Sequence, residues 1–307
     1  MILSCGEALI DMLPRRSVEG EAAFAPYAGG AVFNTAIALG RLGAPSGFLS
    51  GLSTDFFGEM LIDVLTASKV DTRLAVRSAR PTTLAFVRLV DGQASYAFYD
   101  EGTAGRMLAP ADLPVLPASV GALFFGGISL MVEPGGATYE SLMTREAGSG
   151  RVLMIDPNIR PSFIADEAAY RARIARMTGL AQIVKLSDED LRWLEGPGEI
   201  EPLARRILAR GPQAVFVTEG ATGAHAFTAG QTLFEPARKV AVADTVGAGD
   251  TFNAGILAAL HQSGALTRDR VARLTEAELR AALSLGVRAA AVTVSRPGAN
   301  PPWAHEL

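Results

Sequence analysis

The stretch DTVGAGDTFNAG, residues 244–255, places small residues between two aspartates, at a point where a strand pattern gives way to a helix pattern. Residues 238–245, RKVAVADT, alternate in period two and predict a strand. Residues 251–264 carry an apolar stripe and end in a glycine, which predicts a helix. The stretch is therefore expected to form the turn from a strand into a helix, which is the connection that α/β proteins repeat.

The turn itself has the features of an anion site. Gly247, Ala248 and Gly249 bring their amide hydrogens to the N-terminus of the predicted helix, where unpaired amides and the helix dipole both attract negative charge. Glycine has no Cβ, so the backbone can come close to the anion. An ordinary strand–helix turn, with Asp250 as a plain helix cap, is the alternative that these residues leave open.

The rest of the chain narrows the chemistry of that anion. None of the three lysines (Lys69, Lys185 and Lys239) follows a GxxxxG loop, and no GxGxxG opens a first βαβ unit, so Walker A and dinucleotide motifs are absent. A phosphate held by bare amides beside a carboxylate suits phosphoryl transfer to a hydroxyl. Asp250 would accept the proton of that hydroxyl, and the helix N-terminus is expected to keep it ionised.

Composition and charge exclude several other classes of protein. The 307 residues are 49% hydrophobic and 20% charged with a net charge of −4, which is typical of a soluble globular protein. Nucleic acids and anionic membranes reward clustered basic residues, so neither is an expected partner. The single cysteine, Cys5, excludes an internal disulfide framework and suits a reducing cytoplasm. The N-terminus predicts a strand and not a signal peptide, and the apolar run from residue 121 is too short to span a bilayer.

Strand-like and helix-like segments alternate along the chain, which predicts βαβ units and a mainly parallel sheet. The apolar runs that predict strands are 1–10, 45–52, 120–130, 151–156, 181–186 and 213–218. The patterns that predict helices between them are 34–43, 55–68, 166–179 and 199–211.

One segment breaks this rhythm. Residues 81–102 form two alternating stretches joined by Asp91-Gly92, which is a strong hairpin signal. An antiparallel hairpin inside a βα series predicts a separate flap or small sheet.

Two ordered motifs now support a resemblance to a known family. DTVGAGDTFNAG resembles the C-terminal signature of the ribokinase-like (PfkB) carbohydrate kinases, and AGGAVFNTAIALGRLG at 28–43 resembles their N-terminal signature. The resemblance implies a mainly parallel central sheet flanked by helices, in a single kinase domain over 1–307. It also implies a small β-sheet lid formed by about 12–30 and 72–104. Within the family, GEALIDMLP, DPNIRPSFI, VKLSDEDLRWL and VSRPGANPPW most resemble bacterial fructokinases, with 2-keto-3-deoxygluconate kinases and ribokinases as close relatives.

The resemblance assigns the sugar site to particular residues. Besides Asp250 as base and substrate ligand, they are Asp11, Gly29, Gly30, Asn34, Phe98 and Arg160. Asp11 can accept from two adjacent hydroxyls, and its alternative is an exposed loop acid. Asn34 has the alternative of a cap for a helix over 35–43. Arg160 follows a buried strand, where parallel sheets present ligands, and its alternative is a surface arginine on a proline-rich turn.

The nucleotide side is carried over from the same family. The residues that match it are Lys185, Ser187, Thr218, Gly220, Gly223 and Gly249. The family's Asn-x-x-Glu pattern reads Ser187-Asp-Glu-Asp190 here, so either Glu189 or Asp190 would orient water on a magnesium ion that accompanies ATP. Glu219 stands close to where the phosphates would pass, and the sequence provides no physical account of it.

Relatives also imply a potassium ion held by backbone carbonyls, here near Asp244, Val246 and Gly298. The hairpin at 81–99 would form a small sheet with 12–30 and cover the sugar, with Phe98 or Tyr96 facing its ring. An apolar lid leaves an edge and a face exposed, which favours a homodimer through the lid, and a monomer with the lid folded back is the alternative.

The function expected from this resemblance is ATP-dependent phosphorylation of a ketose at its primary hydroxyl, with fructose giving fructose 6-phosphate. A 2-keto-3-deoxygluconate kinase is the alternative in the same class. A non-catalytic sugar- or nucleotide-sensing protein on the same fold is the alternative from a different class. Asp250 argues against the sensor, because a sensor has no need of a base beside the anion hole.

Overall fold

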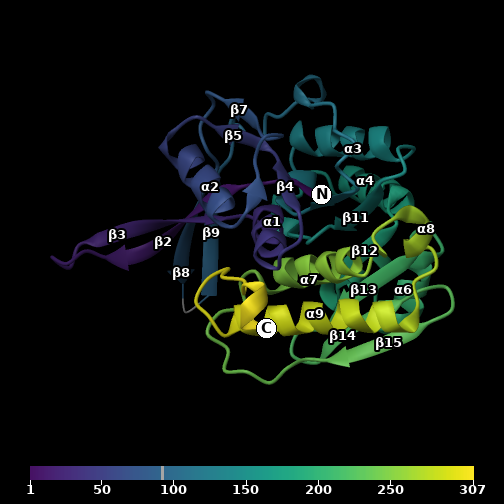
Figure 1. Ribbon diagram of the computed structural model, residues 1–307. Helices are drawn as coiled ribbons and strands as arrows, with labels where there is room; N and C mark the ends of the chain where they lie inside the picture. Colours follow the sequence, from purple (N-terminus) through teal and green to yellow (C-terminus); the bar gives the residue numbers. More distant parts are fainter. Residues whose placement is uncertain (91–92) are drawn as a thin grey trace.

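The structure is a computed structural model that describes residues 1–90 and 93–307. In the described residues a large sheet has the strand order β15-β14-β13-β12-β11-β10-β1-β4-β6 (Figure 1). Its strands are β1 (Ile2–Cys5), β4 (Ser46–Leu49), β6 (Val70–Asp71), β10 (Ala122–Gly126), β11 (Val152–Asp156), β12 (Ile183–Ser187), β13 (Ala214–Thr218), β14 (Gly223–Phe227) and β15 (Thr232–Pro236). All neighbours from β13 to β6 pair in parallel, and β14 and β15 add an antiparallel edge.

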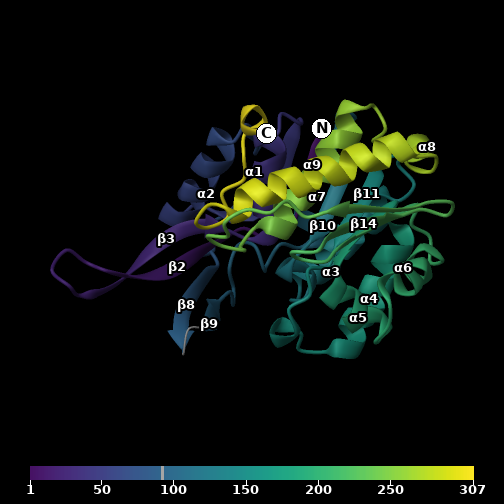
Figure 2. The same cartoon turned by 90° about the horizontal axis from the view of Figure 1, so that it is seen from below.

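Helices cover both faces of this sheet, as Figure 2 shows from below. On one face lie α1 (Ala31–Arg41), α2 (Phe56–Ala67), α7 (Ala248–Gln262) and α9 (Glu276–Val294), with the short α8 (Arg268–Val271) beyond them. On the other face lie α3 (Gly135–Glu146), α4 (Glu167–Leu180), α5 (Asp188–Glu195) and α6 (Ile200–Leu208). The 3₁₀ turns are η1 (Pro110–Asp112), η2 (Ile128–Leu130), η3 (Pro161–Phe163) and η4 (Ala304–Glu306).

The strands are apolar throughout because both of their faces are buried. In β1, Ile2 packs into the core beneath α1 and α7, and Leu3 packs into the core beneath α3 and α4. In β11, Met154 packs into the first of these cores and Ile155 into the second. Successive side chains of a strand point to opposite faces, so a parallel strand covered on both sides reads as a continuous apolar run.

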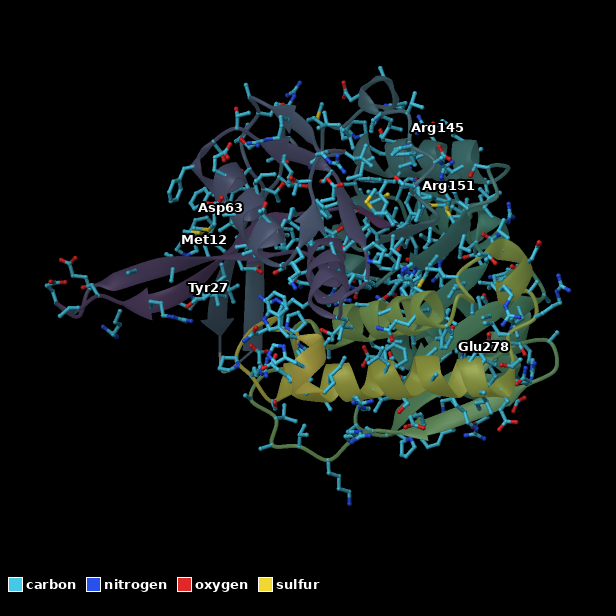
Figure 3. The ribbon with its side chains drawn as sticks, viewed as in Figure 1. Met12, Tyr27, Asp63, Arg145, Arg151 and Glu278 are labelled. Carbon is cyan, nitrogen blue, oxygen red and sulfur yellow. The ribbon has the colours of Figure 1, made fainter. Side chains whose placement is uncertain are left out.

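A second, smaller sheet stands apart from the first. Among the described residues its strand order is β3-β2-β8-β9, from β2 (Leu9–Arg16), β3 (Ala22–Gly29), β8 (Leu84–Val90) and β9 (Gln93–Tyr99). The ribbon of β2 and β3 projects away from the body, and Met12 and Tyr27 mark its base (Figure 3). The predicted hairpin and its pairing with the N-terminal strands are confirmed. Its predicted Asp91-Gly92 turn lies outside the described residues, and so does the side chain of Tyr96.

Several predicted boundaries shift for local reasons. The run 1–10 divides at Gly6 into β1 and β2, which belong to different sheets. A Cβ at Gly6 would lie 2.5 Å from a methyl carbon of Val32, so the chain passes there against α1. The run 45–52 divides at Ser50 into β4 and β5 (Gly51–Ser53), and β5 pairs with β7 (Val76–Ser78).

The predicted strand over 238–245 is wrong. In the described chain these residues form no strand, and Val240 and Val242 are 40% and 64% exposed. The sheet already ends at β15, so the segment has no strand beside it to pair with, and alternation without a partner does not make a strand. Its backbone joins the body only near its end, where Ala243 N and Asp244 N donate to Val294 O at 2.8 and 3.2 Å.

No helix in the described part of the chain is long and apolar enough to cross a membrane.

Candidate active site

A cavity of about 1210 Å³ opens at the carboxyl ends of the parallel strands. Its floor includes Asp156 at the end of β11 and Lys185 in β12, and the N-terminus of α7 forms one wall. The small sheet contributes Asp11 and Phe98 to the opposite side. Open α/β sheets bind ligands at this end, so the fold places the predicted residues where a ligand is expected.

The glycine turn forms the start of α7. Gly247 is the residue before the helix, in the left-handed conformation with φ 79°, and a Cβ there would lie 2.8 Å from the Cβ of Ala299. A Cβ on Gly249 would lie 3.2 Å from Lys185 Nζ, so the ammonium stands directly beside the turn. Gly247, Ala248 and Gly249 all line the cavity at the N-terminus of α7, and Ala248 N donates to Thr245 O at 3.4 Å.

Asp250 sits in the first turn of α7 and is 7% exposed. Its Oδ2 accepts a hydrogen bond from Asn34 Nδ2 at 2.9 Å, so the carboxylate is held by a different helix. In the described structure its side chain does not cap α7, and the helix-cap alternative is wrong. Its backbone carbonyl accepts from Thr35 Oγ1 at 3.2 Å, which fixes the two helix N-termini against each other.

Burial raises the pKa of Asp250 to about 7. The hydrogen bond from Asn34 opposes this rise, the negative charges of Asp156 and Glu7 add to it, and Lys185 opposes it. The expectation that a helix N-terminus keeps this carboxylate ionised is met only above neutral pH, because burial favours the protonated form and a pKa of about 7 leaves the group about half ionised at pH 7. The group instead titrates near neutrality, where a general base is most effective.

Asn34 does not cap a helix. Helix α1 already begins at Ala31 after Gly30, whose φ of 113° is a conformation that glycine adopts readily. Asn34 therefore lies inside α1, 6% exposed, with its amide nitrogen on Asp250. Its Oδ1 has no hydrogen-bond partner within the described residues, and the side chain lines the cavity.

Asp11 lies in β2 and not in a loop, so the exposed-loop alternative is wrong. Burial raises its pKa to about 6. A Cβ on Gly29 would lie 2.4 Å from Asp11 Oδ2, so a larger residue there would displace this carboxylate. Asp11 pairs with Ala85, and Ala85 pairs with Phe98, so Asp11 and Phe98 share one face of the small sheet.

Phe98 also connects the small sheet to the body. Its ring packs edge-on against Phe163 of η3, with centroids 4.3 Å apart. Arg160, just before η3, is exposed and lines the cavity, where its Nη1 donates to the carbonyl of Ile159 at 2.9 Å. The structure therefore brings Arg160 to the same cavity as Asp11 and Asp250.

The predicted nucleotide residues divide into two groups. Lys185 and Gly249 line the cavity, while Ser187 and Thr218 pair with each other at the ends of β12 and β13 outside its walls. Gly220 and Gly223 follow β13 with positive φ and also lie outside. Ser187 caps α5 by accepting from Asp190 N at 2.9 Å.

The acids considered for magnesium differ in their surroundings. Asp190 is buried, and its Oδ1 accepts from Ile159 N at 3.1 Å, whereas Glu189 is exposed. Burial, with a contribution from the charge of Asp156, raises the pKa of Asp190 to about 6. No group of three or more acidic, histidine or cysteine side chains gathers to hold a metal in the part of the chain that is described.

The loops predicted to hold a monovalent ion are tied together. Asp244 accepts from Val246 N and from Gly298 N, each at 3.0 Å, so one carboxylate joins the segment before α7 to the segment after α9. The carboxylate of Glu219 lies 3.5 Å from His225 Nε2 on β14.

Sequence reasoning missed two buried acids of the cavity. Glu7 accepts from Ala31 N at 2.9 Å and Ser129 N at 3.2 Å, and burial raises its pKa. Asp156, the first residue of DPNIRPS, accepts from Lys185 Nζ. An acid at the end of an apolar strand or within two residues of it was the signal that both residues offered.

The fold and site define a kinase of the ribokinase-like class, and comparison with known proteins agrees. Residues 1–306 match the pfkB family of carbohydrate kinases, and the chain belongs to this family. It is 55% identical to a fructokinase of Rhizobium leguminosarum bv. trifolii over 280 residues, covering 91% of this chain and 86% of the relative.

Two solved structures have the same fold. A fructokinase from Xylella fastidiosa with bound ATP superposes with a TM-score of 0.88 at 29% identity, over 97% of this chain and 93% of that one. A double mutant of the fructokinase from Vibrio cholerae O395, in a form with fructose, ADP and potassium ion bound, superposes with a TM-score of 0.84 at 26% identity, over 97% and 93% of the two chains.

Proposed function

We propose that this protein is an ATP-dependent fructokinase, which transfers the terminal phosphoryl group of ATP to the 6-hydroxyl of fructose. The observation that carries the proposal is the position of Asp250. It is buried beside bare glycine amides at the N-terminus of α7, on the wall of a cavity that it shares with Asp11. The 55% identity to a fructokinase over most of the chain supports the choice of sugar.

The reaction follows from the groups around the turn. Asp250 accepts the proton as the sugar oxygen attacks, and a pKa of about 7 suits a base that works near neutral pH. The amides of Gly247, Ala248 and Gly249, with the dipole of α7 and the ammonium of Lys185, stabilise the charge on the moving phosphoryl group. These groups are held in place before the substrates arrive, so they need little reorganisation during the reaction.

The charge of the cavity favours a neutral sugar over a keto-acid. Among the described lining residues, carboxylates outnumber cations: Glu7, Asp11, Asp100, Glu133, Asp156, Asp166 and Asp250 face Arg106, Arg160, Arg173 and Lys185. Of these cations, Arg106 and Arg173 are already paired with Asp100 and with Glu133. A substrate carboxylate would therefore add to an acidic site, so 2-keto-3-deoxygluconate is the less favoured substrate.

In this proposal the fructose lies between the small sheet and α7. Asp11 and Asn34 bind its hydroxyls, Arg160 donates to a ring oxygen, and Phe98 packs against the ring. Gly29 and Gly30 allow backbone to approach the sugar. The small sheet, within residues 12–30 and 72–104, acts as the lid of a single kinase domain over 1–307 and excludes water from the phosphoryl donor.

Magnesium and potassium belong to the nucleotide side. Magnesium would enter with ATP, and Asp190 would orient it through water, because a buried carboxylate that already accepts from Ile159 N is poorly placed for direct ligation. ATP also approaches Ser187, Thr218, Gly220 and Gly223. Carbonyls near Asp244, Val246 and Gly298 would hold a potassium ion; the hydrogen bonds of Asp244 between these two loops support their forming one site.

Exposed aromatic residues on the small sheet support the homodimer proposed through the lid. Phe24 and Tyr99 are 48% and 63% exposed, and both rings contact Phe86 edge-on. Such a cluster is a typical protein contact surface. Sedimentation with a Phe24→Ser variant tests it, since the variant should dissociate and the wild type should not. The enzyme is proposed to act in the cytoplasm, where its lone buried thiol stays reduced.

A coupled kinase assay over a panel of sugars tests the function. We expect fructose and ATP to give turnover, with 2-keto-3-deoxygluconate and ribose far behind. Asp250→Asn serves as the control for contaminating activity. Efficient turnover of 2-keto-3-deoxygluconate with none of fructose would overturn the choice of sugar but leave the kinase standing. ATP binding without turnover of any panel member would favour the sensor.

A further inference from the structure

A buried charge network lies directly behind the anion hole. Asp156, at the end of β11, is 2% exposed. Its Oδ2 accepts from Lys185 Nζ at 3.0 Å and from Asn253 Nδ2 at 2.7 Å, and its Oδ1 accepts from Asn158 N at 3.2 Å. The carboxylate therefore joins three parts of the fold: the neighbouring strand β12, the helix α7, and the loop that follows β11.

The lysine in this network stands at the chemistry. A Cβ on Gly249 would come within 3.2 Å of Lys185 Nζ, so the ammonium lies against the turn that is proposed to receive the phosphoryl group. An ammonium carries three N–H groups, and Asp156 is its hydrogen-bond partner in the described structure. The side chain of Lys185 is 5% exposed, so its position is set by protein contacts and not by water.

Asn253 ties the same carboxylate to the helix that carries the proposed base. It lies on α7, three residues after Asp250, so both side chains project from nearly the same side of the helix. Its Oδ1 has no hydrogen-bond partner among the described residues, although the residue is 1% exposed. Asn253 therefore contributes its amide nitrogen to Asp156.

Stability alone does not account for this arrangement. A buried ion pair gains little over a well-packed apolar pair, because two charges lose their hydration. A charge pair retained at full burial, against a glycine turn, is better explained by what it holds in place.

We propose that Asp156 is a positioning residue, which holds the Lys185 ammonium beside the anion hole and thereby acts on phosphoryl transfer through the lysine. The inference rests on the proposed kinase function and specifies how the phosphate end of that site is held in place. Asp156 itself need not touch either substrate. Its removal is expected to impair the nucleotide half of the reaction and to leave sugar binding nearly intact.

The main experiment is a double-mutant cycle with Asp156→Asn, Lys185→Met and the two combined. If Asp156 acts through the lysine, each single variant should lower kcat by about ten- to a hundredfold. The double variant should then be no worse than Lys185→Met, because the two effects share one path. Multiplied losses in the double variant would overturn the proposal, and so would an unchanged kcat in Asp156→Asn.

A pH profile adds a readout that a loss of structure would not produce. Of the groups that act on Asp250, Asp156 and Glu7 raise its pKa, while Lys185 and the Asn34 hydrogen bond lower it. The acid limb of the kcat/KM profile should therefore move to higher pH in Lys185→Met, because the charge that lowers this pKa is lost. In Asp156→Asn the loss of a negative charge favours a lower pH, and displacement of the ammonium offsets part of that shift. An acid limb that does not move in Lys185→Met would contradict the proposed geometry.

A matched control separates positioning from folding. Glu146 on α3 is a second buried carboxylate, paired with Arg145 at 3.0 Å and Arg151 at 2.6 Å. It is not among the described residues that line the cavity, and its two arginine partners are labelled in Figure 3. Glu146→Gln should lower thermal stability and leave kcat and both KM values unchanged. Asp156→Asn could fail to fold because it leaves the Lys185 ammonium without its partner. In that case the double variant, which removes both charges, is compared with Lys185→Met.

Calorimetry with ADP makes the test independent of the sugar. Asp156→Asn should weaken ADP binding about as much as Lys185→Met does, whichever sugar proves to be the substrate. If fructose is not phosphorylated but both variants still weaken ADP binding equally, only the choice of fructose as substrate is rejected. Normal ADP affinity together with normal kcat in Asp156→Asn would reject the positioning role alone.

Discussion

Replacement of Asp250 by asparagine should abolish most activity and stabilise the protein at the same time. The asparagine side chain is nearly isosteric with aspartate. Its amide oxygen can still accept from Asn34 Nδ2, which lies 2.9 Å from Asp250 Oδ2 in the wild type. The general base is lost, so kcat should fall by at least about 10²-fold, with the KM for fructose within a few-fold of wild type.

The gain in stability follows from the pKa of the buried carboxyl group. Asp250 titrates near 3.8 when unfolded and near 7 when folded, so between these values the unfolded chain binds fewer protons and stability falls as pH rises. A shift of this size corresponds to about 4 kcal/mol above pH 7, at 1.36 kcal/mol per unit. The helix dipole offsets up to about 2 kcal/mol of it. Asp250→Asn should therefore be more stable than wild type by about 2–4 kcal/mol at pH 8, and by less at pH 5.

Two measurements decide the matter. A coupled kinase assay at saturating ATP and fructose gives kcat, and urea unfolding at pH 5 and pH 8 gives the free energy of unfolding. Asp63→Asn, an exposed acid on α2 (Figure 3), is the control and should change neither quantity. A kcat within a few-fold of wild type would refute the role of base. An equal free energy of unfolding for both proteins at pH 8 would refute the effect assigned to burial.

Three further predictions concern the same cavity. Gly249→Val should impair turnover and nucleotide binding with little effect on sugar affinity, because the valine side chain would enter the space beside Lys185 Nζ. Normal ADP affinity by calorimetry together with full activity would contradict this. Arg160→Ala should lower kcat/KM for fructose by about ten- to a hundredfold through the loss of a donor to a sugar oxygen. An unchanged kcat/KM would show that Arg160 does not bind the sugar and is an ordinary surface arginine. For the wild type, kcat/KM should fall about tenfold per pH unit below pH 7, as Asp250 gains its proton. A flat profile down to pH 5 would show that this group does not limit the reaction.

The sequence predicted the sheet and the glycine turn at the start of a helix well because both depend on local patterns. Buried parallel strands read as apolar runs, and the glycines before Asp250 lie where a helix begins. The strand expected over 238–245 failed for the opposite reason. Its alternation is local, but a strand also needs a neighbour, and β15 had already closed that edge of the sheet.

Sequence motifs pointed to the parts of the candidate site in which a side chain lies beside a glycine backbone. They did not reveal the parts in which two side chains from distant segments form a pair. Asp250 and its own turn lie within one motif, and Asp11 was assigned to the sugar through the family resemblance. The pairing of Asp156 with Lys185 joins two strand ends that are separated by a helix in the sequence. The pKa of Asp250 was also out of reach, because it depends on burial by elements from across the chain.

The two halves of the site are built into parts of the fold with different freedom to vary. Residues 251–260 of α7 are all buried, and a Cβ on Gly255 would lie 2.5 Å from the Cα of Gly286 in α9. A substitution along this helix therefore disturbs the core as well as the reaction. Asp11 and Phe98, in contrast, lie on a thin sheet with much of its surface in solvent. A substitution scan scored separately for protein abundance and for activity should show abundance losses concentrated on α7 and activity losses without them on the small sheet. A protein built in this way can change the sugar that it binds far more readily than the reaction that it performs.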